Sequence, residues 1–416
     1  MSTGELIVNV FGQTQGDPLQ NSKISVIDSK TQKVIEQLIT NSSGKSDIVN
    51  INAPNPDYAL EPGAPKPYSE VDILVERKNF NDESIKGIQI FSNSRSIQNV
   101  FLNYRRDDNQ VYSYKIPEHS LYAKYPPKIA EDSVKKISTS SGLAVLPRPV
   151  IPEYIIVHDG LPSDVSSLNY WIPYKNYIKN ACSSEIYPTW PYECIVANVL
   201  TIISFTLNRV YTEWYRNSGY NFTITSSTAY DQSFVYQRNI FSQISEVVDN
   251  LFSQYITKPN IEQPLFTQYC DGEKVSCPGW LSQWGSKQLA ENGANYFDIL
   301  KTYYGYDIYL DIAEQINGVA SSYPGYSLQV GSSGAAVRTI QEQLVEINKK
   351  YPLIPKVAVN GSYGNDTIES VKIFQSTFGL PQSGIVDYAT WYEISRVYVA
   401  VKKLSWGIIK VDNVFF

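Results

Sequence analysis

The residue with the most unusual expected surroundings is Glu185, whose carboxylate follows one apolar helix and precedes another. Residues before a proline avoid helical backbone, so the first helix must end near Glu185, ahead of Tyr187-Pro188. Partial burial and the negative end of the helix dipole both disfavour an ionised carboxylate. These surroundings favour a carboxylic acid that donates a proton near neutral pH. The alternative is a solvated glutamate at an ordinary helix end, which is the commoner case.

Two helices must position this acid. The first is predicted by apolar side chains at i, i+3, i+4 and i+7, which are Tyr174, Tyr177, Ile178 and Ala181. The second begins at Thr189-Trp190-Pro191, because proline is tolerated in a first helical turn and Glu193 suits its positive end. Its apolar residues continue to Trp214, which predicts the central helix of a domain.

Two blocks of sequence around these elements resemble the SpoIID/LytB family. The first is YIKNACSSEIYPTWPYECIVANVL, with a Ser-Glu pair before a Trp-Pro, and the second is CPGWLSQWGSKQLAENGANYFDILKTYYG, about a hundred residues later. The resemblance covers roughly residues 150–315, and with the flanking regions it points to the spore cortex-lytic enzymes. It implies an α+β catalytic domain over residues 150–320 and a lytic transglycosylase whose single catalytic acid is Glu185.

The resemblance also implies a reaction. Glu185 would protonate the oxygen of the β-1,4 bond between muramic acid and N-acetylglucosamine, and would then act as base on the C6 hydroxyl of the same muramic sugar. The product is a 1,6-anhydro sugar, so one carboxylate is enough where ordinary glycosidases use two. Glu193 and Glu213 are interpreted as structural residues at a helix end and on a solvated face.

Two other functions remain open. A two-carboxylate muramidase would use Asp231 as the partner of Glu185. A non-catalytic wall-binding protein would activate a separate amidase. An amidase or peptidase activity of the chain itself is disfavoured, because the sequence shows no histidine cluster or nucleophile triad.

Candidate substrate-binding residues lie between and within the two blocks. We expect Tyr269 and the run Ser282-Gln283-Trp284 to line a glycan groove, with glycines nearby that allow close backbone approach. Trp284 either stacks on a pyranose ring or belongs to the core. Asp231-Gln232 either bind sugar hydroxyls or form a turn.

No metal and no cofactor are expected. In SpoIID, the segment matching Ser226–Gln232 carries His and Cys that bind zinc, whereas this chain has Ala229 and Tyr230 there. The four cysteines are interpreted without a metal: Cys182 and Cys194 as buried thiols, and Cys270 with Cys277 as a pair that the sequence leaves undecided.

Composition bounds the function further. The 416 residues suggest two to four domains, and the net charge of −6 argues against a nucleic-acid partner. The 32 tyrosines and 7 tryptophans weakly support sugar binding. No signal peptide and no membrane span are expected from the sequence.

The N-terminal part predicts a pro-region. Residues 1–105 alternate in the strand manner between turns, at 5–10, 23–27, 34–39 and 71–75, which predicts a small antiparallel sandwich resembling transthyretin-like modules. Residues 106–149 are interpreted as a linker with an activation site. The resemblance implies a zymogen that a subtilisin-like protease cleaves near Ala144-Val145.

The C-terminal part predicts a wall anchor. Residues 326–400 resemble the three-helix peptidoglycan-binding domain, with helices expected at 339–348 and 366–378 and Asn360-Gly361-Ser362-Tyr363-Gly364 between them. The tail 401–416 is interpreted as strands or a docking arm. The expected partner is therefore the glycan of cortex peptidoglycan. The expected location is the spore, in the cortex and coat region outside the forespore membrane.

Overall fold

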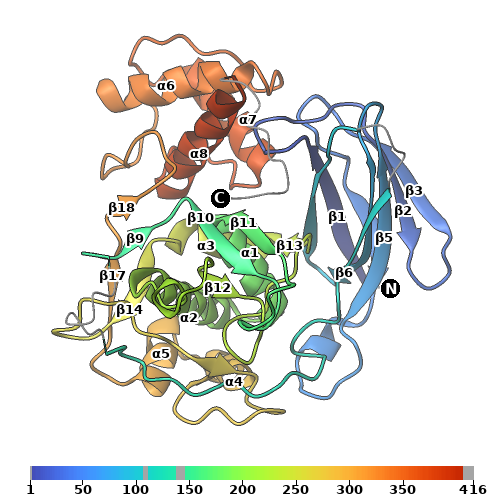
Figure 1. Ribbon diagram of the computed structural model, residues 1–416. Coiled ribbons are helices and arrows are strands. Elements are labelled where there is room, and N and C mark those ends of the chain that lie inside the picture. Colours follow the sequence, from blue (N-terminus) through green and yellow to red (C-terminus); the bar gives the residue numbers. More distant parts are fainter. Residues whose placement is uncertain (1, 106–110, 137–145, 406–416) are drawn as a thin grey trace.

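The computed structural model describes residues 2–105, 111–136 and 146–405. Figure 1 shows three parts: β-sheets from the N-terminal third, a mixed α/β part in the middle of the chain, and a helical C-terminal part. The activation site expected at Ala144-Val145 lies outside the described residues.

The N-terminal part consists of two sheets around a shared apolar core. One sheet has the order β13-β7-β1-β4 and the other β3-β2-β5-β6-β8. The four stretches predicted as strands are strands, but β1 pairs with β7 in parallel and β6 with β8 in parallel, so the arrangement is not purely antiparallel. Strand β7, which lies between β6 and β8 in the sequence, belongs to the other sheet. The chain crosses back after β7, and β8 therefore runs parallel to β6. The strands are β1 Ser2–Phe11, β2 Lys23–Asp28, β3 Val34–Ile39, β4 Val49–Ala53, β5 Tyr68–Glu76, β6 Asp82–Phe91, β7 Arg95–Phe101 and β8 Val111–Lys115.

The middle part is organised around α2, Tyr192–Tyr211. It ends one turn before Trp214, earlier than its apolar pattern predicts. By length and composition α2 could cross a membrane, which the sequence analysis did not anticipate. Its apolar window is completely buried inside the protein, as in the core helix of a globular domain.

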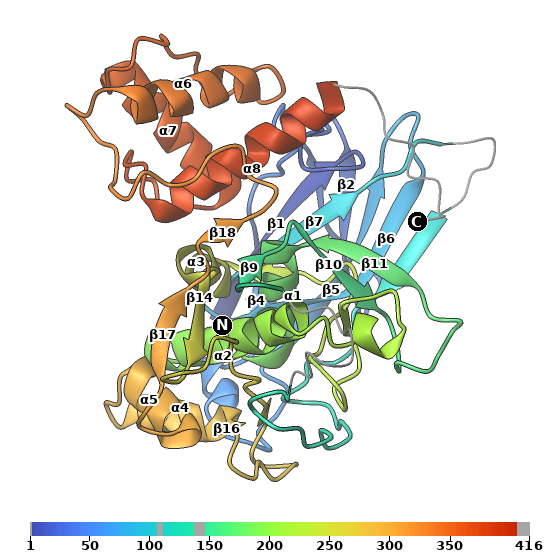
Figure 2. The same ribbon diagram turned by 60° about the vertical axis from the view of Figure 1, so that its left-hand side comes forward.

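Helices and short strands surround α2 on several sides (Figure 2). The helices are α1 Tyr174–Glu185, α3 Ser242–Leu251, α4 Gln283–Glu291 and α5 Tyr296–Tyr304. The strands are β9 Val150–Ile151, β10 Tyr154–His158, β11 Asn169–Pro173, β12 Ile224–Thr225, β13 Ile240–Phe241, β14 Gln254–Thr257, β15 Tyr269–Cys270, β16 Leu281–Ser282, β17 Tyr309–Ile312 and β18 Gln315–Ile316. Strand β13 belongs to the middle part but pairs with β7, so the two parts are joined in one β-sheet.

The segment expected as a linker differs from that expectation. Its described residues contain β8, and residues 116–136, here called the strap, run along the middle part without regular secondary structure. The strap buries charged and polar groups of its own, including His119 and Lys135. It is therefore a packed element of the fold, since a linker would leave such groups in solvent.

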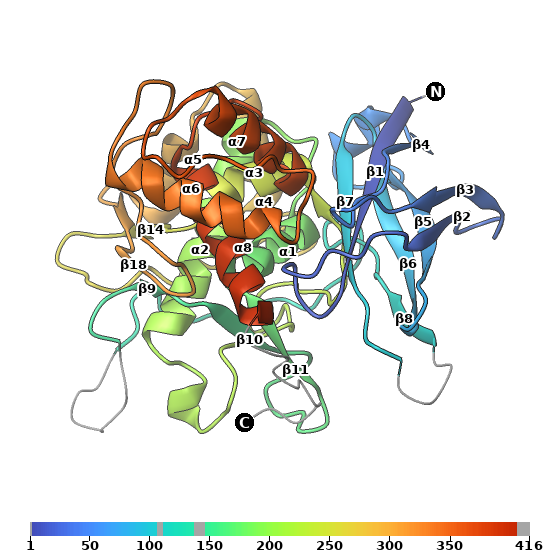
Figure 3. The ribbon, with the colours of Figure 1, turned by 90° about the horizontal axis from the view of Figure 1, so that it is seen from above.

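The C-terminal part contains α6 Ala335–Asn348, α7 Asn365–Phe378 and α8 Tyr388–Ser405. The first two match the predicted helices, while α8 continues into the expected tail, whose residues up to 405 are helical. These helices lie above the middle part in Figure 1 and in front of it in Figure 3, which is seen from above. A buried ion network joins them to it: Lys175 Nζ lies 2.9 Å from Asp249 Oδ1 and 2.8 Å from Glu393 Oε2.

Candidate active site

Glu185 is the last residue of α1 and is 5% exposed. Its Oε1 accepts hydrogen bonds from the Ser233 backbone N–H at 2.8 Å and from the Tyr269 hydroxyl at 3.1 Å. Its Oε2 accepts from Gln283 Nε2 at 3.2 Å. Three elements from distant parts of the sequence therefore fix the orientation of this carboxylate.

Two of the sequence-predicted residues, Tyr269 and Gln283, hold Glu185 directly. Burial, followed by the charge of Glu185, raises the pKa of Tyr269 well above its ordinary value, so the phenol keeps the proton that it donates. Gln283 Nε2 also donates to the Glu185 carbonyl at 3.0 Å, which satisfies an orphan acceptor at the end of α1. These residues position the acid whatever the substrate.

A pocket opens beside Glu185, and the strap forms one of its walls. The residues of the middle part that line it are Glu185, Thr228, Tyr269, Cys270, Asp271, Lys274, Val275 and Gln283, and those of the strap are Ser120, Ala123, Tyr125, Pro126 and Lys128. Asp271 is the other carboxylate in this lining, and its Oδ1 accepts from the backbone N–H groups of Glu273, Lys274 and Val275 at 2.9–3.2 Å. That oxygen is engaged in a turn.

The strap binds the end of α1 itself. Ser120 Oγ donates to the Ser184 carbonyl at 2.5 Å and lies 3.5 Å from Glu185 Oε2. His119 Nε2 lies 3.3 Å from the Ile186 carbonyl, and burial lowers the pKa of His119 well below its ordinary value. Lys128 Nζ bonds the carbonyls of Thr228 and Asp231, and it sits 4.7 Å from the ring centre of Tyr269. The strap therefore covers one side of the pocket beside Glu185.

Lys274, in a loop of the middle part, makes a second set of contacts with the strap. Lys274 Nζ donates to the carbonyls of Leu121, Tyr122 and Ala123 at 2.9, 2.8 and 2.8 Å. Lys274 belongs to a loop closed by a Cys270–Cys277 disulfide, the pairing that the sequence left undecided. Cys182 and Cys194 are buried free thiols, in agreement with their interpretation.

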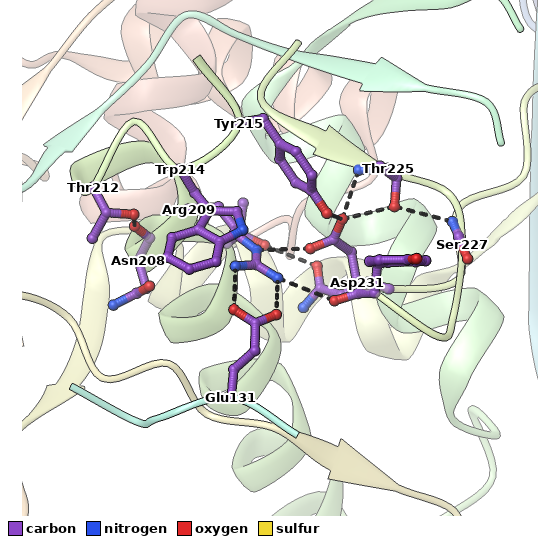
Figure 4. A network of polar contacts seen from close by, with 12 residues as sticks. Glu131, Asn208, Arg209, Thr212, Trp214, Tyr215, Thr225, Ser227 and Asp231 are labelled. Carbon is purple, nitrogen blue, oxygen red and sulfur yellow. Dashed lines mark hydrogen bonds and ion pairs between the residues drawn. The ribbon is translucent and has the colours of Figure 1, made fainter. Parts of the chain in front are cut away.

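Asp231 belongs to a buried ion network (Figure 4). Its Oδ1 accepts from Arg209 Nε at 2.7 Å, and its Oδ2 accepts from the Tyr215 hydroxyl at 2.6 Å and from the backbone N–H and hydroxyl of Thr225 at 2.9 and 2.7 Å. The side chain is fully buried and both oxygens are engaged. The expectation that Asp231 binds sugar or serves as a second catalytic carboxylate does not fit this geometry.

The same network contains a strap residue. Glu131 accepts hydrogen bonds from Arg209 through both oxygens, at 3.0 Å from Nη1 and 2.7 Å from Nη2. Burial alone would lower the pKa of Arg209, but the pairs with Asp231 and Glu131 raise it above the ordinary value. Arg209 is 1% exposed, so the strap supplies one of two carboxylates to a buried cation.

The remaining predicted residues have structural contacts. Gln232 is fully buried and bonds the Tyr177 hydroxyl and Thr206, which does not fit substrate binding. Ser282 is the N-cap of α4 and accepts from the Gly285 N–H at 2.9 Å. Glu193 accepts from the first backbone N–H of α5, at Tyr296, as a structural acid would.

Trp284 is 7% exposed and packs on Trp190 with ring centres 4.9 Å apart. It also lines a second pocket, most of whose other residues belong to the N-terminal part or the strap: Tyr58, Glu61, Gly63, Ala64, Pro67, Leu121 and Tyr122. The indole is thus a core side chain that faces a pocket shared with the segment expected to be removed.

Sequence reasoning missed the strap, Arg209 and Lys274. The strap has no periodic pattern, and its prolines and charges are typical of a linker. The one local signal was the pair Glu131 and Lys135 at i, i+4, whose charged groups lie 2.5 Å apart. Among the residues that the structure describes, no group of three or more His, Cys, Asp or Glu could hold a metal ion.

Comparison with known proteins identifies the C-terminal part. Residues 333–394 match the family model described as "Putative peptidoglycan binding domain". An N-acetylmuramoyl-L-alanine amidase, CwlL of Bacillus licheniformis, is 31% identical over 86 residues, which cover 21% of this chain and 23% of the amidase. The chain spans about a quarter of the length of the curated relatives it matches.

Two solved structures show local similarity. The SleB N-terminal domain is 27% identical with a TM-score of 0.17, over 18% of this chain and 99% of that domain. Catechol 1,2-dioxygenase from Acinetobacter is 11% identical with a TM-score of 0.18, over 27% of this chain and 58% of the enzyme. At these scores neither likeness bears on the middle part. The C-terminal region therefore carries a peptidoglycan-binding domain.

Proposed function

We propose that the protein is a spore cortex-lytic enzyme of the SleC type, a lytic transglycosylase made as a zymogen. The observation that carries the proposal is the Glu185 carboxylate, held by Ser233, Tyr269 and Gln283 in a pocket that the strap covers. A peptidoglycan-binding domain on the same chain supports peptidoglycan as the substrate.

The proposed chemistry assigns both proton transfers to Glu185. As an acid it would protonate the leaving oxygen of the muramic acid–N-acetylglucosamine bond, and as a base it would take the proton of the muramic C6 hydroxyl as that oxygen attacks C1. Tyr269 and Gln283 would hold the carboxyl group through both steps. A muramidase needs a second carboxylate, and Asp231, its candidate, is committed to Arg209.

The proposed zymogen follows from the position of the strap. Ser120 and Lys128 precede the expected cleavage site, so a cut near Ala144-Val145 would separate them covalently from the pocket that they line. Until then the strap excludes a glycan strand from Glu185 by occupying its approach. The matching partner is a subtilisin-like protease, and the proposed location is the spore cortex.

Product analysis tests the proposal. The full chain, before and after limited digestion with subtilisin, is incubated with purified cortex peptidoglycan, and soluble products are read by mass spectrometry. The proposal predicts 1,6-anhydro-muropeptides after digestion and almost none before it. Hydrated reducing ends would identify a muramidase instead. Binding without any soluble product would identify a wall-binding activator of another enzyme.

A further inference from the structure

The guanidinium of Arg209 has two hydrogen-bonding edges, and only one of them is paired within the middle part by a carboxylate. Its Nε edge is neutralised within the middle part by Asp231, and Asp231 is itself held by Tyr215 and Thr225. The other edge, formed by Nη1 and Nη2, points at the strap and donates to both oxygens of Glu131 (Figure 4). A guanidinium fork of this kind matches the plane and spacing of a carboxylate.

Removal of the strap would take both hydrogen bonds to Glu131 from this edge. Nη2 would keep the Tyr230 carbonyl at 3.1 Å, whereas Nη1 has no bond other than that to Glu131 among the described residues. Lys128 and Lys135 would leave with the strap, so Arg209 would be the remaining cation of this network. Water can enter the vacated place, but a carboxylate from another source would bind the guanidinium fork through two charge-assisted hydrogen bonds.

The place that Glu131 would vacate lies three residues along the strap from Lys128, which lines the Glu185 pocket. Asp231 pairs with Arg209, and Ser233, two residues on, donates its backbone N–H to Glu185. The strap follows the same course, with Ser120 near Glu185, Lys128 on the carbonyls of Thr228 and Asp231, and Glu131 on Arg209. A polymer that replaces the strap would therefore meet the acid and the arginine along one path.

We propose that Arg209 is a carboxylate-binding subsite, hidden by Glu131 in the intact chain and taken by a carboxylate of the peptidoglycan once the strap has left. The inference rests on the proposed function for its substrate. The carboxylate comes either from a stem peptide or from the lactyl group of a muramic acid that lacks a peptide. Glu131 occupies the subsite as a mimic of that group.

The first test uses the full chain and needs no catalysis. Glu131→Ala empties the carboxylate position, and thermal unfolding is followed in sodium acetate and in sodium chloride of equal ionic strength. At an acetate concentration about ten times its dissociation constant, acetate is expected to raise the Tm of E131A by about 3 °C and to leave the wild type within about 1 °C. Glu193→Ala, which removes a carboxylate from a backbone N–H rather than from an arginine, is the matched control and should not respond. An equal response to acetate and chloride, or an equal response of the control, would overturn the subsite.

The second test uses the subtilisin-treated full chain on three forms of peptidoglycan: native, stripped of peptides to give free lactyl carboxylates, and with all carboxylates amidated. We expect kcat/KM on the amidated form to fall at least about tenfold below the better of the other two, since hydrogen bonds to charged groups contribute about 1.5–3 kcal/mol. The better form identifies the source of the carboxylate. Equal rates on all three overturn the subsite whatever acetate does. Absence of cleavage on every form contradicts the proposed lytic function, and the acetate result then decides the subsite alone.

Discussion

Lys274 is expected to contribute to the free energy needed to separate the strap from the middle part. Its ammonium donates to three successive strap carbonyls at 2.8–2.9 Å, those of Leu121, Tyr122 and Ala123. Lys274→Met keeps the aliphatic stem and removes the three donors. Because water replaces part of what an exposed ammonium contributes, the three bonds together should be worth about 1 kcal/mol rather than the sum of three buried ones.

Hydrogen exchange of the strap amides measures this quantity. The backbone N–H groups of Ser120 and Ile129 bond the carbonyls of Ser184 and Ala229 in the middle part, so they exchange when the strap opens. A loss of about 1 kcal/mol corresponds to roughly fivefold faster exchange at these amides. Lys258→Met is the control, because Lys258 pairs with Asp307 at 2.8 Å, outside the strap. Unchanged exchange in K274M, or the same acceleration in K258M, would refute the clamp.

Three further predictions follow from buried groups. Burial raises the pKa of Glu83 to about 8, so the folded state holds a proton that the unfolded state releases near pH 4.5, and stability falls as pH rises from about 4.5 to 8. In urea titrations, Glu83→Gln should therefore have the same free energy of unfolding as the wild type at pH 4 and a higher one at pH 8.5, by at most about 5 kcal/mol. The prediction is contradicted if variant and wild type are equally stable at pH 8.5 as well as at pH 4. Lys175→Met removes the cation that Asp249 and Glu393 share, while Asp249 keeps Lys179 and Glu393 keeps Arg396. The change should cost about 2 kcal/mol in the same assay, and a loss under about 1 kcal/mol would mean that Lys175 contributes no more than a surface pair. Gln283→Ala should lower the kcat of the subtilisin-treated protein about tenfold with KM little changed, because the proposed proton-transferring carboxyl of Glu185 loses one of the donors that orient it. A change in KM alone would indicate a binding role for this pocket-lining residue.

The parts of the fold with local periodicity could be predicted from the sequence. The apolar spacing from Tyr174 to Ala181 and the proline at 188 placed α1 and its end at Glu185, because both signals act within a few residues. The two helices expected in the C-terminal domain, at 339–348 and 366–378, were predicted within a few residues for the same reason. The catalytic role of Glu185 stays a prediction.

The parts that depend on distant partners could not be predicted. Glu131 and Arg209 lie 78 residues apart and meet only because the strap crosses α2, so no local pattern marks their pairing. An aspartate in a loop, such as Asp231, is a residue type that often binds sugars. Its pairing with Arg209, which lies on α2, is what buries it, and the sequence around Asp231 gives no sign of that pairing. The parallel return of β8 likewise depends on β7 joining the other sheet.

The central claim is that Glu185 performs the proton transfers. The direct measurement compares the subtilisin-treated full chain with its Glu185→Gln variant on cortex peptidoglycan, with Glu193→Gln as a matched change at a structural acid. The amide of the variant has one acceptor oxygen in place of two, so some of the hydrogen bonds to Glu185 are lost. Folding of the variant is therefore checked by its Tm. We predict that E185Q binds peptidoglycan and releases at least about a hundredfold less anhydro-muropeptide, while E193Q keeps near wild-type release. Release by a folded E185Q at the wild-type rate would contradict the account.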